Sequence, residues 1–416
     1  MDTKNRVVVT GIGVVSPVGK TVDQFWNSLV NGISGIAPIT LCDPSPFPCK
    51  IAGEVKDFDP SDYMDLKDAK RMARFSQLAV AASQMAIVDS GIDISDENVD
   101  EIGVFVGNGN GGFPDIEANA RLLVDKGAMR VSPFFIPMIL PNMAAANVSR
   151  VFGIKGYTST ITTACAAGTQ SIGEAAEVLK KGYANVILAG GCEAGISQLG
   201  LGGFSTIRAL TSQNENPKTA SKPFDANRDG FVPAEGAAML ILETEKHAMD
   251  RGADIYAEIL GYGVSSDAYH LVQPDKDGDG AFRAIMNSLK DSQITKSEID
   301  YINAHGTSTP MNDLSETLAI KKTFGSLAPK IPISSTKSMI GHSLGASGSL
   351  EAIACVKTIV DQVIHPTINY ETPDPVCDLD YVPNQSRSGK RIQVVLSNAF
   401  GFGGQNACLL FKEYSE

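Results

Sequence analysis

The chain has 416 residues, of which 43% are hydrophobic and 20% are charged, and its formal net charge is −12. This composition supplies enough apolar surface for a large folded core and argues against disorder, because disordered chains are poor in hydrophobic residues. The negative charge argues against general binding to nucleic acid or to anionic membranes. An acidic partner would therefore need a local basic patch.

The seven cysteines are scattered and odd in number, and no two form a C-x-x-C pair. This pattern is neither a disulfide framework nor a zinc site, and it is typical of a reducing compartment. The N-terminal stretch MDTKNRVVVTGIG has no hydrophobic signal core, and no window approaches about 18 uninterrupted apolar residues. We therefore expect a soluble, cytoplasmic protein without membrane insertion.

The N-terminal part begins with a predicted strand over residues 7–9 and a turn at Gly11 and Gly13. These glycines half-match the dinucleotide fingerprint G-x-G-x-x-G, but the third glycine and an acidic residue about 20 positions on are missing, which argues against NAD binding. The pattern predicts a helix over 21–29, capped by its first residue, and a surface loop over 42–60.

Four basic residues, Lys67, Lys70, Arg71 and Arg74, follow at spacings of three and four. This spacing predicts that they line one face of a helix. Such a stripe is most often a solvated face, but in so acidic a chain it is also a candidate docking surface for an acidic partner. A strand over 102–106 then ends in a glycine loop that lacks the Lys-Ser/Thr of a phosphate-binding P-loop.

The pattern of residues 158–182, TSTITTACAAGTQSIGEAAEVLKKG, changes its period at Cys165. The β-branched residues before the cysteine predict the end of a strand, and the apolar stripe after it predicts a helix that ends at Gly182. A helix start points free backbone N–H groups and the positive end of the helix dipole at the sulfur, which favours the nucleophilic thiolate. The alternative is a buried structural cysteine, the commoner role of a free thiol.

The rest of the chain has the pattern of an α/β protein. It predicts strands over 185–191, 237–242, 331–335, 394–397 and 407–411, a turn over 337–345 and a helix over 347–360. Two of the five histidines, His305 and His342, lie in glycine- and hydroxyl-rich turns after strands. Turns of this kind commonly carry the chemistry of α/β proteins.

Two segments of the chain are similar to each other. Cys165-AAGTQSIGEA aligns with His342-SLGASGSLEA, and Gly-Phe pairs at 230–231 and 401–402 each precede an apolar strand that ends in Glu. The sequence therefore predicts two copies of one α/β unit, which we divide into residues 1–261 and 262–416. Equivalent helix starts would then meet, so we expect His342 within about 10 Å of Cys165.

Four separated motifs carry a family resemblance: TTACAAGTQSIG, NAHGTSTPMND, SSTKSMIGHSLGASGSLEA and SNAFGFGGQN. In this order they resemble the condensing enzymes of fatty-acid synthesis, the β-ketoacyl-acyl-carrier-protein synthase II family, over nearly the whole chain. The resemblance implies the thiolase fold, two duplicated βαβαβ-type halves in a five-layered α-β-α-β-α body, and a homodimer. It also implies an acyltransferase that condenses an acyl group with malonyl-acyl carrier protein in fatty-acid elongation, with loss of carbon dioxide. No metal and no cofactor are implied, because the phosphopantetheine arrives on the carrier protein.

The resemblance further implies a role for individual residues. Cys165 would hold the acyl group as a thioester, and His305 and His342 would donate hydrogen bonds to the malonyl thioester carbonyl as negative charge develops there. Lys337, in reach of Glu351, would set the local charge and hold the histidines.

The remaining implied residues form an oxyanion hole, a substrate tunnel and a docking surface. The backbone N–H groups of Cys165 and Phe402 would form the oxyanion hole, with Phe402 also acting as a gate. Substrate binding would involve Thr307, Thr309, Phe400, Phe204, Asn110 and Phe135 of the partner subunit, and carrier docking would involve Lys67, Lys70, Arg71, Arg74, Arg130 and Arg208. Asn110 stands where the family has an apolar residue at the end of the acyl pocket, so we expect an altered chain-length preference.

Other functions match parts of the sequence. Gly341-His-Ser-Leu-Gly345 has the G-x-S-x-G pattern of serine hydrolases and acyltransferases, which would make Ser343 the nucleophile, but of the Asp and His needed downstream only His365 is a candidate. A ketosynthase of a polyketide or specialised lipid pathway has nearly the same motifs. A non-catalytic partner of such a synthase would lack Cys165.

Overall fold

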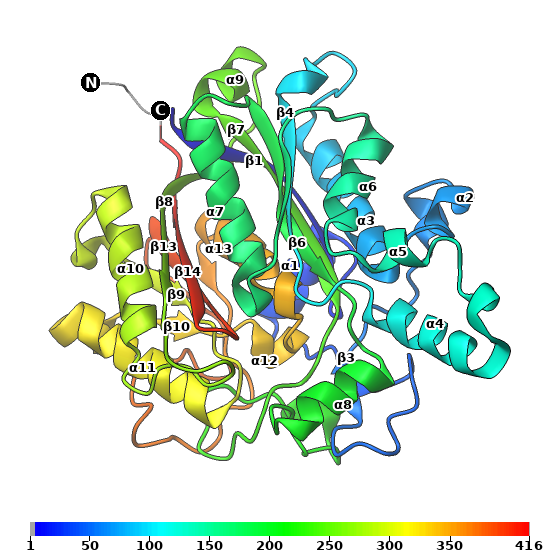
Figure 1. The fold of residues 1–416 in the computed structure, drawn as a ribbon. Coiled ribbons are helices and arrows are strands. Elements are labelled where there is room, and N and C mark those ends of the chain that lie inside the picture. Colours follow the sequence, from blue (N-terminus) through cyan, green and yellow to red (C-terminus); the bar gives the residue numbers. More distant parts are fainter. Residues whose placement is uncertain (1–4, 416) are drawn as a thin grey trace.

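The computed structural model describes residues 5–415 and contains two runs of five strands (Figure 1). The N-terminal run consists of β1 (Val7–Val15), β4 (Ile102–Gly107), β5 (Thr158–Ile161), β6 (Val186–Glu193) and β7 (Gly236–Thr244). The C-terminal run consists of β8 (Ala257–Ser266), β9 (Tyr301–Asn303), β10 (Ile333–Ser334), β13 (Val394–Gly401) and β14 (Gln405–Lys412). Two small sheets pair β2 (Ile36–Pro38) with β3 (Ile51–Gly53) and β11 (Val363–Ile364) with β12 (Arg387–Ser388).

The two runs have the same topology. Their strand orders are β5-β4-β6-β7-β1 and β10-β9-β13-β14-β8, so each run places its third strand outermost, followed by its second, fourth, fifth and first. In each run the first three of these strands are parallel and the last two pair antiparallel to their neighbours. This repeat confirms the prediction of two copies of one α/β unit.

The two runs join through the pairing of β1 with β8, where Val8 lies opposite Glu258 and Val9 opposite Ala257. Ten strands therefore form one continuous sheet. The expected division between residues 261 and 262 falls inside β8, so no break in the sheet marks it.

Helices cover the sheet in layers (Figure 1). α3 (Arg74–Ser90) and α6 (Met143–Phe152) cover the outer face of the N-terminal run, and α10 (Asp279–Ser292), with α11 (Pro310–Phe324) packed on it, covers that of the C-terminal run. α7 (Ala167–Lys180) and α13 (Ser347–Asp361) lie between the two runs. Separate hydrophobic clusters fill the central layer and the two outer interfaces, as a five-layered body requires.

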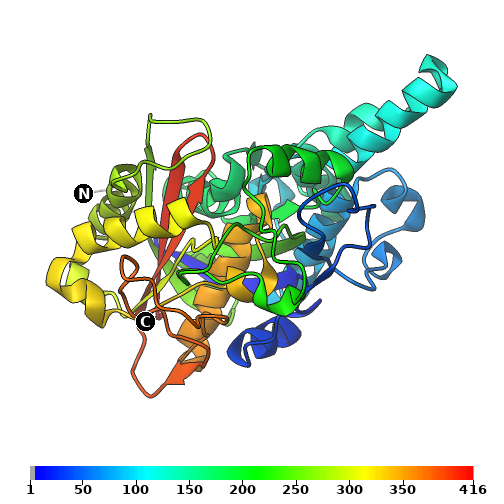
Figure 2. The ribbon, with the colours of Figure 1, turned by 90° about the horizontal axis from the view of Figure 1, so that it is seen from below.

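The other helices lie around these layers: α1 (Val22–Val30), α2 (Leu66–Ala69), α4 (Phe113–Lys126), α5 (Phe135–Ile139), α8 (Gln198–Thr206), α9 (Glu245–Asp250) and α12 (Lys337–Ile340). α4 projects away from the body (Figure 2). Within residues 5–415, no helix has both the length and the apolar content needed to cross a membrane. Residues 1–4, where the expectation of a missing signal core partly falls, lie outside the described chain.

The predicted glycine turn at Gly11 and Gly13 is wrong, because β1 continues through both residues. A Cβ atom at Gly11 would lie 2.4 Å from the carbonyl oxygen of Ala86, and one at Gly13 would lie 2.1 Å from that of Ala82. Both carbonyls belong to α3. The glycines therefore allow a helix to pack closely on the strand, which is a role that a sequence pattern does not distinguish from a turn.

The central helices α7 and α13 also approach each other at glycines. A Cβ atom at Gly168 would lie 2.8 Å from the carbonyl oxygen of Gly345, and one at Gly348 would lie 2.0 Å from Thr169 Oγ1. This close packing brings the N-terminal ends of the two helices together. Each end follows the third strand of its own half, so the duplicated fold brings the two equivalent turns together.

Candidate active site

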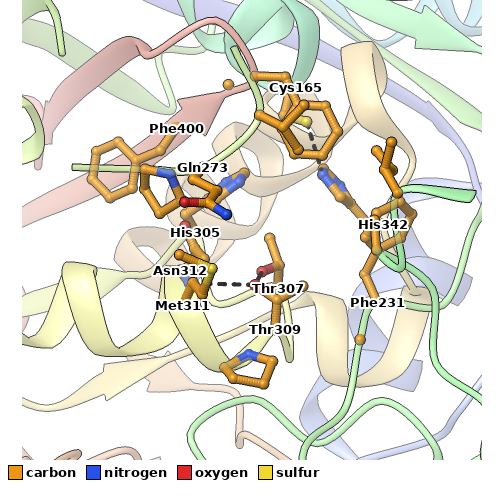
Figure 3. Close-up of a pocket in the computed structure, with 18 of the residues that line it drawn as sticks. Cys165, Phe231, Gln273, His305, Thr307, Thr309, Met311, Asn312, His342 and Phe400 are labelled. Carbon is orange, nitrogen blue, oxygen red and sulfur yellow. Dashed lines mark hydrogen bonds between the residues drawn. The ribbon is translucent and has the colours of Figure 1, made fainter. Parts of the chain in front are cut away.

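Cys165 and His342 meet where the central helices begin. Cys165 lies in a 3-10 turn, Ala164–Ala166, between β5 and α7, and His342 lies between α12 and α13. His342 Nε2 is 3.0 Å from Cys165 Sγ (Figure 3), which confirms the prediction drawn from the internal repeat. The residues before them, Ala164 and Gly341, have φ values of 49° and 74°. For Ala164 this left-handed conformation is strained, and such strain is concentrated at functional sites.

His305 and Lys337 lie next to this pair. The ring of His305, which follows β9, has its centroid 5.4 Å from that of His342. Lys337 Nζ lies 3.3 Å from His305 Nδ1 and forms an ion pair with Glu351 of α13. Both charged side chains are fully buried, so removing either one would leave an uncompensated charge in the core.

Burial controls the protonation of Cys165. It raises the pKa of the thiol to about 11, although the Lys337 ammonium and the backbone N–H groups of Phe402 and Cys165 act in the opposite direction. The expectation that the helix start favours the thiolate is therefore wrong in its outcome. The N–H groups have the expected effect, but the loss of solvent around a buried sulfur outweighs it.

The two histidines are neutral at pH 7. Burial, helped by the nearby Lys337 ammonium, lowers the pKa of both His305 and His342 well below the usual value. Since an ammonium can only donate, His305 Nδ1 accepts from Lys337 and the ring proton lies on Nε2. His305 is thereby fixed as an N–H donor.

Cys165, His305 and His342 also place three ligand atoms within 4.8 Å of one another, which could hold a metal ion. The fit is poor, because the bond from Lys337 leaves neither nitrogen of His305 free as a ligand. A divalent cation would also lie beside the Lys337 ammonium.

A cavity of about 460 Å³ leads to these side chains. It brings together eight of the residues predicted from the sequence: Cys165, Arg208, His305, Thr307, Thr309, His342, Phe400 and Phe402. The hydroxyls of Thr307 and Thr309 are 2.9 Å apart on its wall (Figure 3). Val272 and Gln273 also line it, and the Phe400 ring packs edge-to-face against that of His305 with 5.7 Å between ring centroids.

Asn110, Phe135 and Phe204 do not line this cavity. The Phe204 ring lies 6.4 Å from that of Phe402. The Asn110 amide Nδ2 is buried without a hydrogen-bond partner among residues 5–415. Phe135 lies in α5, and its predicted role concerns a second subunit, so all three assignments stay predictions.

Three buried residues at the site were not found by sequence reasoning. Glu193 accepts backbone N–H groups from the loop after β4 and from the turn after His342. Glu316 accepts those of His305 and the following glycine. Ser347 Oγ lies 2.9 Å from His342 Nδ1. Ser347 belongs to the small-residue helix start that the repeat identified, but the two glutamates are brought to the site only by the fold.

The four basic residues at positions 67–74 do not share one helix. α2 ends at Ala69, and α3 begins at Arg74. Arg74 forms an ion pair with the buried Glu235, with 2.7 Å between Nε and Oε2, and is therefore not part of an open docking surface. The basic side chains of Lys67, Lys70 and Arg71 are exposed and line a hollow with Phe134 and with Asp65 and Leu66.

A duplicated five-layered α/β body with a Cys-His-His cluster between its halves defines the thiolase-like ketosynthase fold. Solved structures agree with this class. One described as the ishigamide ketosynthase/chain length factor has a TM-score of 0.93 at 36% identity, covering 99% of this chain and 100% of that one. A beta-ketoacyl synthase from Burkholderia phymatum has a TM-score of 0.91 at 36% identity with the same coverage.

Residues 4–248 match the family described as beta-ketoacyl synthase, N-terminal domain, and residues 256–371 match its C-terminal domain. The chain belongs to the beta-ketoacyl synthase family. It is 51% identical to a 3-oxoacyl-(acyl-carrier-protein) synthase 2 of Synechocystis sp., over 99% of both chains. It is 49% identical to the protein of the same name in Coxiella burnetii, over 98% of both chains.

Proposed function

We propose that this protein elongates acyl chains in fatty-acid synthesis by condensing an acyl group on Cys165 with malonyl-acyl carrier protein. The observation that carries the proposal is the contact of Cys165 with His342, beside His305, at a cavity of about 460 Å³. The full-length relatives named 3-oxoacyl-(acyl-carrier-protein) synthase 2 support the same reaction.

In the first step the Cys165 thiol attacks the thioester carbonyl of the acyl carrier protein. His342 Nε2, 3.0 Å from the sulfur, accepts the thiol proton and passes it to the departing phosphopantetheine sulfur. One carbon–sulfur bond forms as the other breaks. The backbone N–H groups of Cys165 and Phe402, which face the sulfur in the free protein, would stabilise the negative oxygen of the intermediate.

In the second step malonyl-acyl carrier protein loses carbon dioxide and becomes an enolate. His305 Nε2–H donates to the enolate oxygen, and His342 is the second donor. The Ser347 hydroxyl can accept or donate, so it stabilises either tautomer of His342. The enolate carbon then attacks the acyl thioester, the bond to Cys165 Sγ breaks, and the thiolate that leaves takes up one proton from solvent, which restores the thiol.

The partner of this reaction is the acidic acyl carrier protein. The exposed side chains of Lys67, Lys70 and Arg71 would dock it, together with Arg130 and with Arg208 at the cavity mouth. One similar solved structure, at 37% identity and a TM-score of 0.91, is described as a ketosynthase with its type II polyketide acyl-carrier protein. The phosphopantetheine arm of the carrier protein that docks on this chain would lie along Thr307 and Thr309.

A homodimer would cover apolar surface that a single chain leaves exposed. β5 is the outermost strand of its run, and Tyr157 beside it is 53% exposed. On the nearby arm of α4 and α5, Val124 is 84% exposed, Met129 95% and Ile136 57%. Edges and apolar patches of this kind favour association.

All seven cysteines are free, which supports a reducing, cytoplasmic location.

One assay tests the proposal: purified protein with malonyl-acyl carrier protein and a ladder of acyl carrier-protein substrates, with products identified by mass. We expect a single two-carbon extension, abolished by Cys165→Ser and retained by Ser343→Ala. Loss of activity only in Ser343→Ala would instead support a serine acyltransferase. Repeated condensation without reduction would support a polyketide ketosynthase, and one of the similar solved structures is described as a type II polyketide synthase complex.

A further inference from the structure

A buried polar cluster lies behind His305 and Lys337. It consists of Tyr301, Asn303, Ser334, Thr336 and His365, all fully buried, and none of them lines the cavity that contains Cys165. Burying five polar side chains is costly unless they bond to one another. Their hydrogen bonds show what the cluster holds in place.

The bond directions follow from His365. Its Nδ1 is 3.1 Å from the carbonyl oxygen of Pro366, which can only accept, so Nδ1 carries the proton and Nε2 is an acceptor. Thr336 Oγ1, 3.0 Å away, donates to Nε2, and Asn303 Nδ2 donates to Thr336 Oγ1 across 2.9 Å. Burial lowers the pKa of His365 to about 4, so this neutral form persists at pH 7.

The cluster is joined through the backbone to two residues of the active site. Asn303 ends β9 two residues before His305, and Thr336 directly precedes Lys337. The chain after His365 also contacts the segment that precedes Lys337, because Thr367 Oγ1 accepts the backbone N–H of Ser335 across 3.0 Å. No hydrogen bond joins the five side chains to Cys165 or His342 within residues 5–415.

We propose that His365 is a positioning residue for malonyl decarboxylation. Its imidazole ties the segment before Lys337 to the end of β9 and so holds the Lys337 ammonium against His305 Nδ1, which keeps the proton of His305 on Nε2. His365 touches no substrate. The inference rests on the proposed function, in which His305 and His342 both donate to the enolate, whereas acyl transfer uses Cys165 and His342 without His305.

The experiment compares the two half-reactions in His365→Leu and His365→Gln. Acyl transfer to Cys165 is followed by mass, and decarboxylation by carbon dioxide release from malonyl-acyl carrier protein. We expect His365→Leu to lower the decarboxylation rate constant about tenfold to a hundredfold and to leave acyl transfer within about twofold. His365→Gln, whose amide can both accept and donate, should recover most of the lost rate.

Leu289→Ala in α10 is the control for stability loss alone, and it should leave the ratio of the two rates unchanged. Thr336→Val removes the donor to His365 and tests the same bond if His365→Leu does not fold. A loss that is equal in both half-reactions, or no loss, in the folded variants overturns the inference. The wild-type protein is measured first. If it releases no carbon dioxide from the malonyl substrate, the proposed function itself fails, and this result is distinct from a failure of the inference about His365.

Discussion

The side-chain amide of Asn110 is a donor that is buried without a partner among residues 5–415, while the backbone N–H of Asn110 donates to Glu193. An unpaired buried donor costs about 1–3 kcal/mol. We predict that Asn110→Ile raises the free energy of unfolding by about 1 kcal/mol, measured by urea denaturation, because an apolar side chain removes the unpaired group. If Asn110 closes the acyl pocket as predicted, the same variant should shift the products of the ladder assay toward longer chains.

Gln84 in α3 is a matched control, because its Oε1 is also buried without a partner among residues 5–415. Gln84→Leu should raise stability and leave the product lengths unchanged. A stabilised Asn110→Ile with an unchanged length profile would place Asn110 outside the acyl pocket.

Much of the catalytic cluster was predictable from single residues, but its electrostatics were not. The repeat placed His342 opposite Cys165 because duplicated helices begin at equivalent points. The balance of burial against N–H donors at Cys165 depends on how much solvent the fold excludes, and the sequence carries no measure of that. The same applies to Arg74, whose spacing indicated a surface stripe although its partner Glu235 lies 161 residues away in the chain.

At the scale of elements, the contact of α7 with α13 sets the distance between the two catalytic turns. A Cβ atom at Gly348 would lie 2.0 Å from Thr169 Oγ1 and 2.7 Å from its backbone nitrogen. We predict that Gly348→Ala destabilises the protein by about 2 kcal/mol or more and lowers the rate of Cys165 acylation, because the helices must separate. Urea denaturation and acyl transfer followed by mass measure the two effects.

Gly203 in α8 is the control, because a Cβ atom there meets no atom of the described residues within 4 Å. Gly203→Ala should be neutral or stabilising by up to about 1 kcal/mol, since alanine has the higher helix propensity. If Gly348→Ala behaved like Gly203→Ala, the close contact would not determine the geometry of the site.

The segment that carries His365 should also make stability depend on pH. Burial lowers its pKa from the usual 6.5 to about 4, so the unfolded chain binds a proton that the folded chain excludes. The stability that neutral His365 contributes is complete above about pH 6.5 and is lost as the pH falls toward 4, by roughly 3 kcal/mol. We predict that His365→Leu flattens this part of the curve of unfolding free energy against pH.

His247 provides a control for the direction in which the free energy of unfolding changes with pH. Its contacts with Glu243 and Glu97 raise its pKa, so its contribution is present at low pH and is lost as the pH rises. His247→Gln should therefore change the curve in the opposite direction to His365→Leu. Equal changes from the two variants would show that neither histidine controls the slope.

Element positions were predictable where the period was clear, as for the strand at 102–106 and the helices at 21–29 and 347–360. The glycines of β1 are a case in which the sequence pattern did not predict the structure. Glycine marks both turns and close packing, and only the presence of α3 against the strand separates the two.

At the scale of the whole molecule, the duplication was readable because both halves repeat the same motifs in the same order. The five-layered arrangement was implied only by the family resemblance, because the pattern of strands along the chain does not show which faces of the strands pack on the same helices. The duplication also explains why the site is central: each half supplies one end of a helix, and both ends lie in the middle layer between the two runs of strands.

The surface that would receive the carrier protein lies on one face, although the whole chain is acidic. Lys67, Lys70 and Arg71 are exposed there, with the Arg71 guanidinium 5.0 Å from the centre of the Phe134 ring, whereas Arg74 is paired with Glu235. We predict that Lys67→Glu combined with Arg71→Glu raises KM for acyl carrier-protein substrates at least tenfold and leaves kcat nearly unchanged, because docking depends on complementary charge.

A short acyl-pantetheine substrate, which has no acidic carrier, should be used equally well by the wild-type protein and by the double variant. Arg74→Gln is the matched control. It should lower stability by about 3 kcal/mol, because it leaves the carboxylate of the buried Glu235 without its partly exposed partner, and it should cause no selective rise in KM for the carrier. Added salt should weaken carrier binding to the wild-type protein and narrow the difference from the double variant, because exposed charges are screened. An equal loss on carrier-bound and free pantetheine substrates would contradict docking at this face.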